Sequence, residues 1–393
     1  MNGIHADLAI AGGGIAGLWV LRRALAAGYD AVLFEAETLG GVQTLASQGM
    51  IHGGLKYALS GLLNPASEAI AGMPERWRAC LAGDSEPDLR GLEVSSSKYY
   101  LFAESGTIGG LTTFFASRSL RGRIRKLDAA ERPAAFEGFD GAIYALDDFA
   151  INTEALIRRL CEGVENRLYS LRLDASNVRR ISDGFCIRAG DTDLYVDQFV
   201  NCAGAGGGAL AEALAPGRFP MQLRPLHQVI VHTRLPAPLF AHCLTRITRP
   251  EPRLTLTTHR TARAGVPGDV LYVGGQLSTD GVTRSSEEQI AFARRELAQC
   301  LPWLSLEDAR FETLRIDRAE PQQASGLKPD QAFVAEWGRF IQAWPTKLTL
   351  APDLADRVLA LLPPLQVPAP LGSDSTRLPL PRPALGESPW GPT

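Results

Sequence analysis

Cysteine is scarce in this chain, and no two cysteines stand close enough together to suggest a shared metal ion or a redox pair. The 393 residues include 6 cysteines, all scattered singly, and no C-x-x-C motif occurs. No apolar stretch reaches the roughly 18 residues that a membrane-spanning helix needs, and the N-terminus lacks a basic region followed by an apolar signal core. We therefore expect a reduced, cytoplasmic protein without a transmembrane segment, while peripheral membrane contact stays open.

The chain also lacks a block of positive charge and the short motifs of common hydrolases. Its formal net charge is -3 and its isoelectric point is near 6.1, so there is no basic field to attract a nucleic acid. Neither H-E-x-x-H nor G-x-S-x-G occurs, and zinc or serine hydrolysis therefore has no support. We expect no nucleic-acid partner and no metal site.

Glycine, in contrast, is concentrated near the N-terminus between two apolar stretches. The stretch "DLAIA" (7–11) is typical of a buried strand, and "LWVLRRALAAG" (18–28) is typical of a helix that ends at a glycine. A second strand, "AVLFEA" (31–36), follows at once. The three predict a β-α-β unit of about 30 residues.

The glycines inside this unit have the spacing of a dinucleotide-binding loop, G-x-G-x-x-G. The first glycine permits a tight turn, the second lets the backbone approach a pyrophosphate, and the third lets helix and strand pack closely. The helix N-terminus adds unpaired N–H donors, and Glu35 is the acid expected on the ribose hydroxyls. The residues expected to bind the cofactor here are Gly12, Gly14, Ile15, Ala16, Gly17, Glu35 and Ala36.

The course of the chain after this unit favours FAD over NAD. A nicotinamide dehydrogenase usually continues through further β-α units, whereas this chain enters a long strand-rich region. It returns at "FVNCAGAGGG" (199–208), where Ala203 and Gly204 are expected to pass the same cofactor. The second cluster fits G-x-G-x-x-A, but a proline-containing segment follows it instead of a long helix and an acidic strand end. One dinucleotide, bound by separated pieces of chain, is the simpler interpretation.

Three separated stretches resemble the FAD-dependent D-amino-acid oxidase superfamily, and within it the FAD-linked glycerol-3-phosphate dehydrogenases. They are "AGGGIAG" with "LFEAE", then "ASQGMIHGGLKY", then "WPTKLTLAP". The resemblance implies that the second stretch passes the flavin and contacts the substrate, and that the third closes over the flavin. It adds Ser47, Gln48, Gly49, Thr346, Lys347, Leu348 and Thr349 to the cofactor-binding residues, and it implies substrate contacts from Lys56 and Tyr57.

Lys347 has a physical role beside this resemblance. Hydride arriving at flavin N5 leaves negative charge around N1 and O2, which a lysine and a helix N-terminus can stabilise. The alternative is an ordinary solvated lysine at a helix start.

The substrate residues depart from the glycerol-3-phosphate pattern. Lys56 stands where those enzymes have arginine, and lysine lacks the bidentate fork that suits phosphate. Arg318 or Arg315 lies where an anion-binding arginine is expected, although the chain has "GLKP" (326–329) where the relatives have Gly-Val-Arg-Pro. These departures argue against glycerol 3-phosphate itself and favour a small anion such as an amino acid or a hydroxy acid.

The role of His52 stays open between three readings. It can act as a base or positioning group, it can attach the flavin covalently as in the dimethylglycine and sarcosine dehydrogenases, or it can fix the turn before Gly53 and Gly54 by hydrogen bonds. His227 and His259 could face the active site, but satisfied sheet positions are the commoner outcome for such histidines.

The sequence as a whole predicts a mixed α/β fold with a Rossmann-like FAD-binding domain and an interleaved, strand-rich substrate domain. The FAD domain is expected at 1–60, 150–215 and 311–362, the substrate domain at 61–149 and 216–310, and a Pro-rich extended or disordered tail at 363–393.

The predicted activity is FAD-dependent oxidation of a small anionic substrate at a carbon that carries an amine or a hydroxyl. The candidate catalytic residues are His52, Lys56, Tyr57, Arg318 and Lys347. The electron acceptor, whether oxygen, a quinone or a carrier protein, stays open. Competing hypotheses are a non-catalytic flavin-binding partner or redox-sensing protein, and an enzyme that acts on a modified macromolecule.

Overall fold

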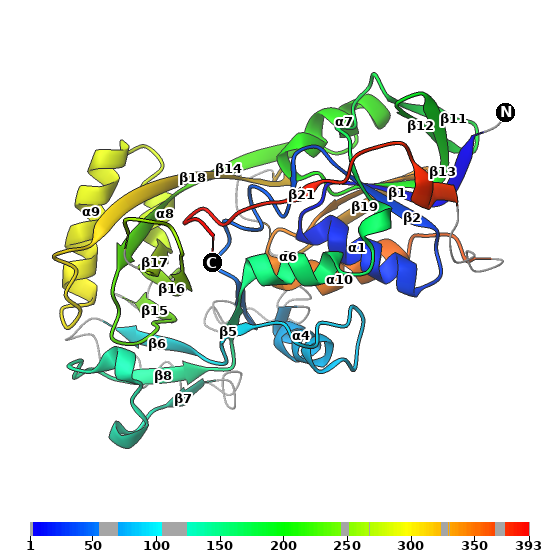
Figure 1. Ribbon diagram of the computed structural model, residues 1–393. Coiled ribbons are helices and arrows are strands. Elements are labelled where there is room, and N and C mark those ends of the chain that lie inside the picture. The colour runs from blue at the N-terminus through cyan, green and yellow to red at the C-terminus, as the bar shows by residue number, and fades with distance from the viewer. Residues whose placement is uncertain are drawn as a thin grey trace.

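The computed structural model describes residues 3–54, 70–103, 124–244, 251–266, 268–323, 329, 331–365 and 374–392. These residues form two large regions, each built around an eight-stranded sheet, and the long strands of the second sheet reach back toward the first (Figure 1). The mixed α/β architecture predicted from the sequence is confirmed.

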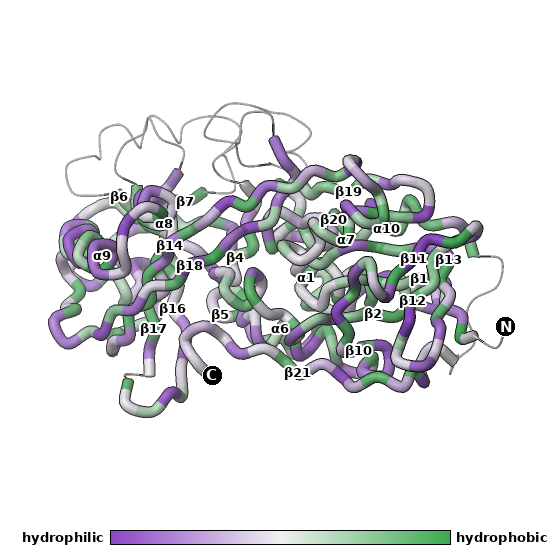
Figure 2. Tube along the Cα trace, turned by 90° about the horizontal axis from the view of Figure 1, so that it is seen from above, coloured by the Kyte–Doolittle hydropathy of each residue, from purple (hydrophilic) through white to green (hydrophobic). Residues whose placement is uncertain are grey.

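The first sheet has parallel strands at its centre, in the order β10-β2-β1-β13-β12-β11, with β20 on β13 and β19 on β20. Alternate residues of its strands enter different cores: Leu8 and Ile10 pack under the helices α1 and α10, and Ala9 packs on the other face. A sheet covered on both faces needs such continuous apolar strands, and Figure 2 shows hydrophobic residues concentrated there. The strands are β1 (Ile4–Ala11), β2 (Ala31–Glu35), β10 (Leu168–Ser170), β11 (Val178–Ile181), β12 (Gly184–Ala189), β13 (Thr192–Asn201), β19 (Phe333–Trp337) and β20 (Phe340–Trp344).

The second sheet has the order β18-β14-β17-β16-β15-β6-β8-β7. One of its faces packs against α9, where Val229 and Val231 meet Leu297 in a second core. Gln228, one position along β14, points to the opposite face because side chains alternate along a strand. The strands are β6 (Tyr99–Ala103), β7 (Ile124–Lys126), β8 (Ile143–Leu146), β14 (Met221–Thr233), β15 (Ala241–Leu244), β16 (Leu254–Arg260), β17 (Asp269–Gly274) and β18 (Arg310–Pro321).

Two small sheets and the helices complete the described fold. The order in one small sheet is β4-β9-β5, from β4 (Met50–Ile51), β9 (Phe149–Ile151) and β5 (Val94–Ser96), and the other joins β3 (Thr38–Leu39) to β21 (Ala384–Leu385). The α-helices are α1 (Ile15–Ala26), α4 (Met73–Ala82), α6 (Thr153–Cys161), α7 (Gly207–Leu214), α8 (Gln276–Asp280), α9 (Ser286–Cys300) and α10 (Ala351–Leu359). Short 3-10 helices are η2 (Ala129–Glu131), η3 (Ala134–Phe136), η4 (Glu165–Arg167), η5 (Gly204–Gly206), η6 (Leu348–Leu350) and η7 (Asp374–Arg377).

Local capping signals place the helix starts. The Asn152 side chain accepts a hydrogen bond from the N–H of Ala155 at 3.0 Å, so Asn152 caps α6. Ser285 and Glu288 form a reciprocal capping box at the start of α9. These contacts are encoded within four residues, which is why the sequence predicts both helices.

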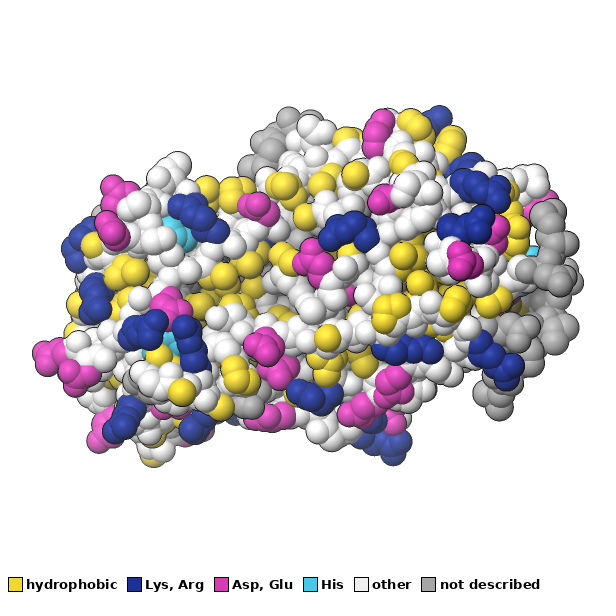
Figure 3. All heavy atoms as spheres, turned by 45° about the horizontal axis from the view of Figure 1, so that its top comes forward, with side chains coloured by type: hydrophobic (Ala, Val, Ile, Leu, Met, Phe, Trp, Pro, Cys, Tyr) yellow, Lys and Arg dark blue, Asp and Glu magenta, His cyan; other side chains and the backbone are white. Residues whose placement is uncertain are grey.

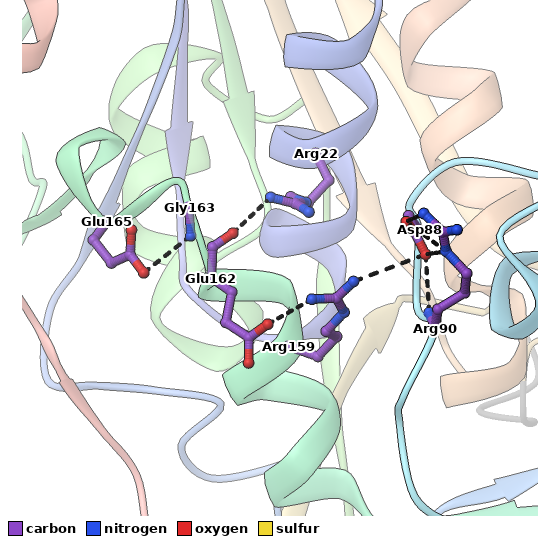
Figure 4. A network of polar contacts seen from close by, with 7 residues as sticks. All are labelled: Arg22, Asp88, Arg90, Arg159, Glu162, Gly163 and Glu165. Carbon is purple, nitrogen blue, oxygen red and sulfur yellow. Dashed lines mark hydrogen bonds and ion pairs between the residues drawn. The ribbon is translucent and has the colours of Figure 1, made fainter.

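A polar network anchors α6 to its neighbours (Figure 4). Arg159 reaches Glu162 at 2.6 Å and Asp88 at 3.8 Å, and Arg22 of α1 donates to the carbonyl of Glu162 at 3.0 Å. Exposed ion pairs of this kind each add little stability. Their effect is to fix the loop that contains Asp88 against the first region.

Two of the expected domain boundaries differ from the sheet topology. β18 pairs with β14 along its whole length, so 310–321 lies in the second sheet although the sequence analysis places 311 in the FAD domain. Conversely, Trp77 and Cys80 of α4 pack into the core of the first region, although 61–149 was expected in the other domain. Both differences arise because residues far apart in the chain pair or pack together, and local sequence patterns do not predict such contacts.

The C-terminal segment crosses from the first region to the second (Figure 1). Near its start, the buried Ser375 hydroxyl donates to Asp30 at 2.6 Å and accepts from Arg167 at 2.7 Å. At its end, the Trp390 ring is 1% exposed and stacks on His259 with ring centroids 4.0 Å apart. Residues 374–392 are thus largely extended, and the alternative of a disordered tail does not apply to them. The composition of the tail predicts that it cannot fold alone. It does not predict the contacts that the tail makes with the rest of the chain.

The charges on the surface are mixed. On the face drawn in Figure 3, Lys and Arg side chains of the described residues lie among Asp and Glu side chains. In the part of the chain that the structure describes, no helix is long and apolar enough to cross a membrane.

Substitution Trp390→Ala should lower the free energy of unfolding by about 3–5 kcal/mol, because it removes a buried indole and leaves a cavity beside His259. Urea denaturation of both proteins measures the difference. Glu387→Ala, at an exposed position in the same segment, is the matched control. A loss below about 1 kcal/mol for Trp390→Ala would show that the tail contributes little to stability.

Candidate active site

A cavity of about 570 Å³ lies between the carboxyl ends of β1, β2 and β13 and one face of the second sheet. The carboxyl edge of a parallel sheet is where α/β proteins bind ligands. Its lining extends from Glu35 at the end of β2 to Arg318 on β18, so pieces of chain far apart in sequence share it.

The glycine loop forms one wall of the cavity. Gly12 has φ +99°, in the left-handed region, and its N–H donates to the carbonyl of Phe34 at 2.8 Å. A Cβ at Gly14 would meet only the Thr44 hydroxyl, at 3.2 Å, because the position faces open space. Gly14 caps α1 without a side-chain hydrogen bond, and the first N–H groups of that helix are available for an anion.

Glu35 is held at the edge of this loop. One carboxylate oxygen accepts from the N–H of Gly13 at 2.6 Å, and the other accepts from the N–H of Glu37 at 2.8 Å. A carboxylate oxygen has two acceptor sites, so each retains one for a hydroxyl group. Thr44, which the sequence analysis missed, accepts from the N–H of Ile15 at 3.1 Å and also lines the cavity. A lone threonine in a turn carries no signal for such a contact.

The second glycine cluster lies against the first. The N–H of Cys202 donates to the carbonyl of Ala11 at 2.8 Å, and a Cβ at Gly12 would lie 2.6 Å from Cα of Ala203. Gly204, with φ +52°, continues the cavity wall. The predicted return of the chain to the same cavity is therefore what the structure shows.

A threonine joins the two other predicted stretches. The Thr349 hydroxyl, which is buried, accepts from the N–H of His52 at 3.3 Å and donates to its carbonyl at 3.2 Å. The imidazole Nδ1 of His52 accepts from the N–H of Gly54 at 3.2 Å, and Asp148 accepts from the N–H of Gly53 at 2.9 Å. These bonds support the turn-fixing reading of His52, whose side chain also lines the cavity.

Thr346 and Lys347 lie in the same part of the wall. Thr346 has φ +59°, an unfavourable conformation for a β-branched residue that costs about 1–3 kcal/mol. Its hydroxyl donates to the carbonyl of Gln331 at 3.0 Å and holds the turn. Lys347 follows as the residue before η6, which leads directly into α10.

The second sheet supplies the opposite wall through one row of residues. Gly274, Thr255, His242 and Leu101 are successive partners across β17, β16, β15 and β6, and Gln228 of β14 lies beside Gly274. All except the glycine line the cavity. The gap over Gly274 is filled by Gln48, whose amide donates to the carbonyl of Thr255 at 2.9 Å. Gln48 thus ties the two regions together.

His242 is neutral in this wall. Burial lowers the pKa of His242 to about 3. Its Nδ1 lies 3.0 Å from the Thr255 hydroxyl, and its ring packs on Tyr99 with centroids 4.7 Å apart. No local sequence signal marks His242, because the register that brings it to the cavity is set by distant strands.

Arg318 brings an uncompensated positive charge to the cavity. Its Nε and Nη2 are buried and have no hydrogen-bond acceptor among the described residues. Burial and the positive charge of Arg224 lower the pKa of Arg318 to about 10, and Glu320 and Glu251 oppose the shift. The guanidinium remains charged at neutral pH and is in place for an anion.

Other candidates lie elsewhere. Arg315 donates to the carbonyls of Val282 and Arg284 at 2.8 and 2.6 Å and lies outside the cavity lining, whereas Arg318 lies in it. His227 bonds the carbonyl of Gly281 at 2.9 Å, and His259 packs on Trp390, both outside the cavity lining. Lys56 and Tyr57 lie outside the described residues.

Most of the predicted cofactor residues line the cavity. They are Gly12, Gly14, Ile15, Ala16, Glu35, Ala36, Ser47, Gln48, Ala203, Gly204, Thr346, Lys347 and Leu348. Gly17, Gly49 and Thr349 stand behind the wall. A side chain at Gly17 or Gly49 would strike the backbone of Gly12 or Ile151, so both glycines permit close packing.

Three features of the site suit a flavin dinucleotide: the glycine loop is open, Glu35 is held by hydrogen bonds, and the cavity extends to a second sheet. Among the described residues, no group of three or more His, Cys, Asp or Glu side chains could hold a metal ion. The family model for FAD-dependent oxidoreductases of the D-amino-acid oxidase type matches residues 7–339. The chain belongs to this family, it is an FAD-dependent oxidoreductase, and FAD is its cofactor.

A probable FAD-dependent oxidoreductase of Pseudomonas aeruginosa is 47% identical over 392 residues, which cover 98% of each chain. The crystal structure of the P. aeruginosa oxidoreductase has a TM-score of 0.81 at 41% identity and covers 99% of this chain and 98% of that one. The L-α-glycerophosphate oxidase of Mycoplasma pneumoniae with FAD bound has a TM-score of 0.66 at 13% identity and covers 94% and 98%. The glycine oxidase of Geobacillus kaustophilus has a TM-score of 0.62 at 17% identity and covers 94% and 97%. The two distant likenesses show the fold alone.

Substitution Thr349→Val should weaken FAD retention and lower the free energy of unfolding by about 1–3 kcal/mol, because it leaves the N–H and carbonyl of His52 without the hydroxyl between them. Thr349→Ser keeps that hydroxyl and is the control. Denaturation of the cofactor-free proteins and fluorescence titration with FAD measure both effects. Equal behaviour of the two variants would exclude the Thr349 contact as a determinant of the site.

His242 should make stability depend on pH. Its folded pKa of about 3 lies below the value near 6.5 of an unfolded histidine, so the unfolded chain binds more protons between these values and stability rises with pH in that window. Substitution His242→Asn should flatten the slope between about pH 4 and 6 by up to about 1.4 kcal/mol per pH unit. Denaturation across the range tests this, and measurements near pH 8 give the control, since there the slopes of the two proteins should agree.

Proposed function

We propose that this oxidoreductase removes hydride from a carbon that bears an amine or a hydroxyl in a small anionic substrate. The substrate class comprises amino acids, hydroxy acids and glycerol 3-phosphate. Arg318 is the observation that carries this proposal, because a buried guanidinium with two unpaired nitrogens in a cavity wall is suited to bind an anion. The products are the corresponding imine or carbonyl compounds.

The division of work follows from the residues of the cavity. FAD supplies the hydride acceptor when bound, and the protein orients the substrate and tunes the electrostatics around it. Arg318 holds the anion, and the turn of His52 to Gly54 gives the cofactor a close, glycine-containing wall. Lys347 and the helix start behind it supply positive charge where negative charge develops on reduction.

The setting of the reaction belongs to the same proposal. All 6 cysteines are free and buried, which supports a reducing, cytoplasmic environment. Burial raises the pKa of Cys202, beside the cavity, to about 12, so its thiol stays protonated and takes no part as a nucleophile.

Substitution Arg318→Met should weaken binding of the anionic substrate while FAD stays bound. Loss of a charged hydrogen-bonding partner is worth about 1.5–3 kcal/mol, which corresponds to a rise of roughly 10-fold to 150-fold in the apparent Kd. The measurement is anaerobic loss of the yellow flavin colour in a screen of amino acids, hydroxy acids and glycerol 3-phosphate, with NADH as the negative control.

Arg315→Met is the matched control for this experiment, since its guanidinium binds backbone carbonyls outside the cavity. The proposal fails if no anionic compound reduces the flavin of the unaltered protein. The role of Arg318 alone fails if Arg318→Met keeps the same dependence on substrate concentration.

A further inference from the structure

We propose that Glu320 makes the anion site selective for a substrate with a single negative charge, by neutralising Arg224 beside Arg318. The proposal rests on the proposed function and narrows it: a monocarboxylate, such as an amino or hydroxy acid with an uncharged side chain, is preferred over a phosphate dianion or a dicarboxylate. The proposal rests on the position of Arg224, Arg318 and Glu320, which lie together on one face of the β14–β18 pair.

The strand register places these three side chains together. Arg224 of β14 is the direct partner of Arg318 on β18, and Glu320 stands two residues beyond Arg318. Side chains two residues apart on a strand share a face, and diagonal partners on neighbouring strands are within reach of long side chains. Arg318 and Glu320 both line the cavity on that face.

The hydrogen bonds divide the two arginines into different roles. Nε and Nη2 of Arg224 donate to the two carboxylate oxygens of Glu320 at 2.9 and 2.6 Å, in a bidentate pair. Glu320 is 1% exposed, so this pair is shielded from water. The corresponding Nε and Nη2 of Arg318 have no acceptor among the described residues. Arg224 is therefore occupied by Glu320, whereas the guanidinium of Arg318 has two nitrogens that no carboxylate of the described residues pairs with.

The balance of charge sets the preference. Arg224 and Glu320 neutralise each other in their bidentate pair, so Arg318 presents one guanidinium charge to a ligand, and one substrate carboxylate can pair with it. A second negative charge on the ligand would meet the Glu320 carboxylate in a poorly solvated place, where like charges repel strongly. Glu251, which also lines the cavity and acts on the charge of Arg318, adds to that repulsion.

Glu320 also prevents Arg224 from serving as a second anion-binding group. A dianion would be bound best by both guanidinium groups, but the forked donors of Arg224 already point at Glu320. Replacing the carboxylate by an amide removes the negative charge and weakens the hold on Arg224. Glu320 is thus a specificity-determining residue.

The test uses the full chain loaded with FAD and measures equilibrium binding through the change in the flavin absorption spectrum. The probes are acetate as a monoanion, malonate as a dicarboxylate, and methyl phosphate, which is a dianion well above a second pKa of about 6. The unaltered protein should bind acetate more tightly than either dianion. In Glu320→Gln the ratio of dianion to acetate affinity should rise by at least about tenfold.

A second variant guards against loss of folding when one partner of a buried pair is removed. Arg224→Met with Glu320→Leu replaces the pair by apolar side chains of similar size, and it should raise the ratio less than Glu320→Gln does, because Arg224 is absent. A ratio unchanged in both variants, or dianions that bind the unaltered protein more tightly than acetate, would overturn the proposal. Substitution Arg318→Met distinguishes failure of the selectivity proposal from failure of the proposed function. If Arg318→Met binds all three probes as the unaltered protein does, Arg318 is not the anion site.

Discussion

The parallel pairing of β1 with β13 is the constraint on which the rest of this site depends. Because the two strands end at the same edge of the sheet, the loops that follow them must share one small space, and Gly12 faces the backbone of Ala203. Glycine is required there to let two backbones approach closely, and the approach leaves N–H groups directed at a ligand. Strand order therefore brings the two glycine clusters together at one cavity wall.

The second sheet completes the site by presenting one row of residues from Gln228 to Leu101 to the cavity. Along this row the side chains change from amide and hydroxyl groups to a neutral imidazole and then to an aliphatic group. Arg318 and Glu320 lie to one side of the row, on β18. In the proposed function, loops bind the cofactor and the second sheet meets the substrate. Substrate preference can change there through single residues that leave the cofactor wall unaltered.

The sequence predicts the parts of this protein whose signals are local. The caps at Asn152 and Ser285 lie within a few residues of the N–H groups that they bind, and Glu35 bonds Gly13 inside the same β-α-β unit as the glycine loop. His242 and Glu320 carry no such signal, because strand register brings them to the cavity, and register depends on partners up to a hundred residues away. The composition of the tail predicts an extended or disordered segment, whereas its contacts come from Asp30, Arg167 and His259 on other elements.

The course of the chain between the two regions has a consequence for how the molecule could be divided. It passes from one sheet to the other several times, and the last passage ends with Trp390 beneath the second sheet. A single cut in the backbone would leave each half without strands that its own sheet needs. Neither region corresponds to one continuous stretch of the chain. Exchange of one continuous segment with another gene therefore could not transfer either region by itself.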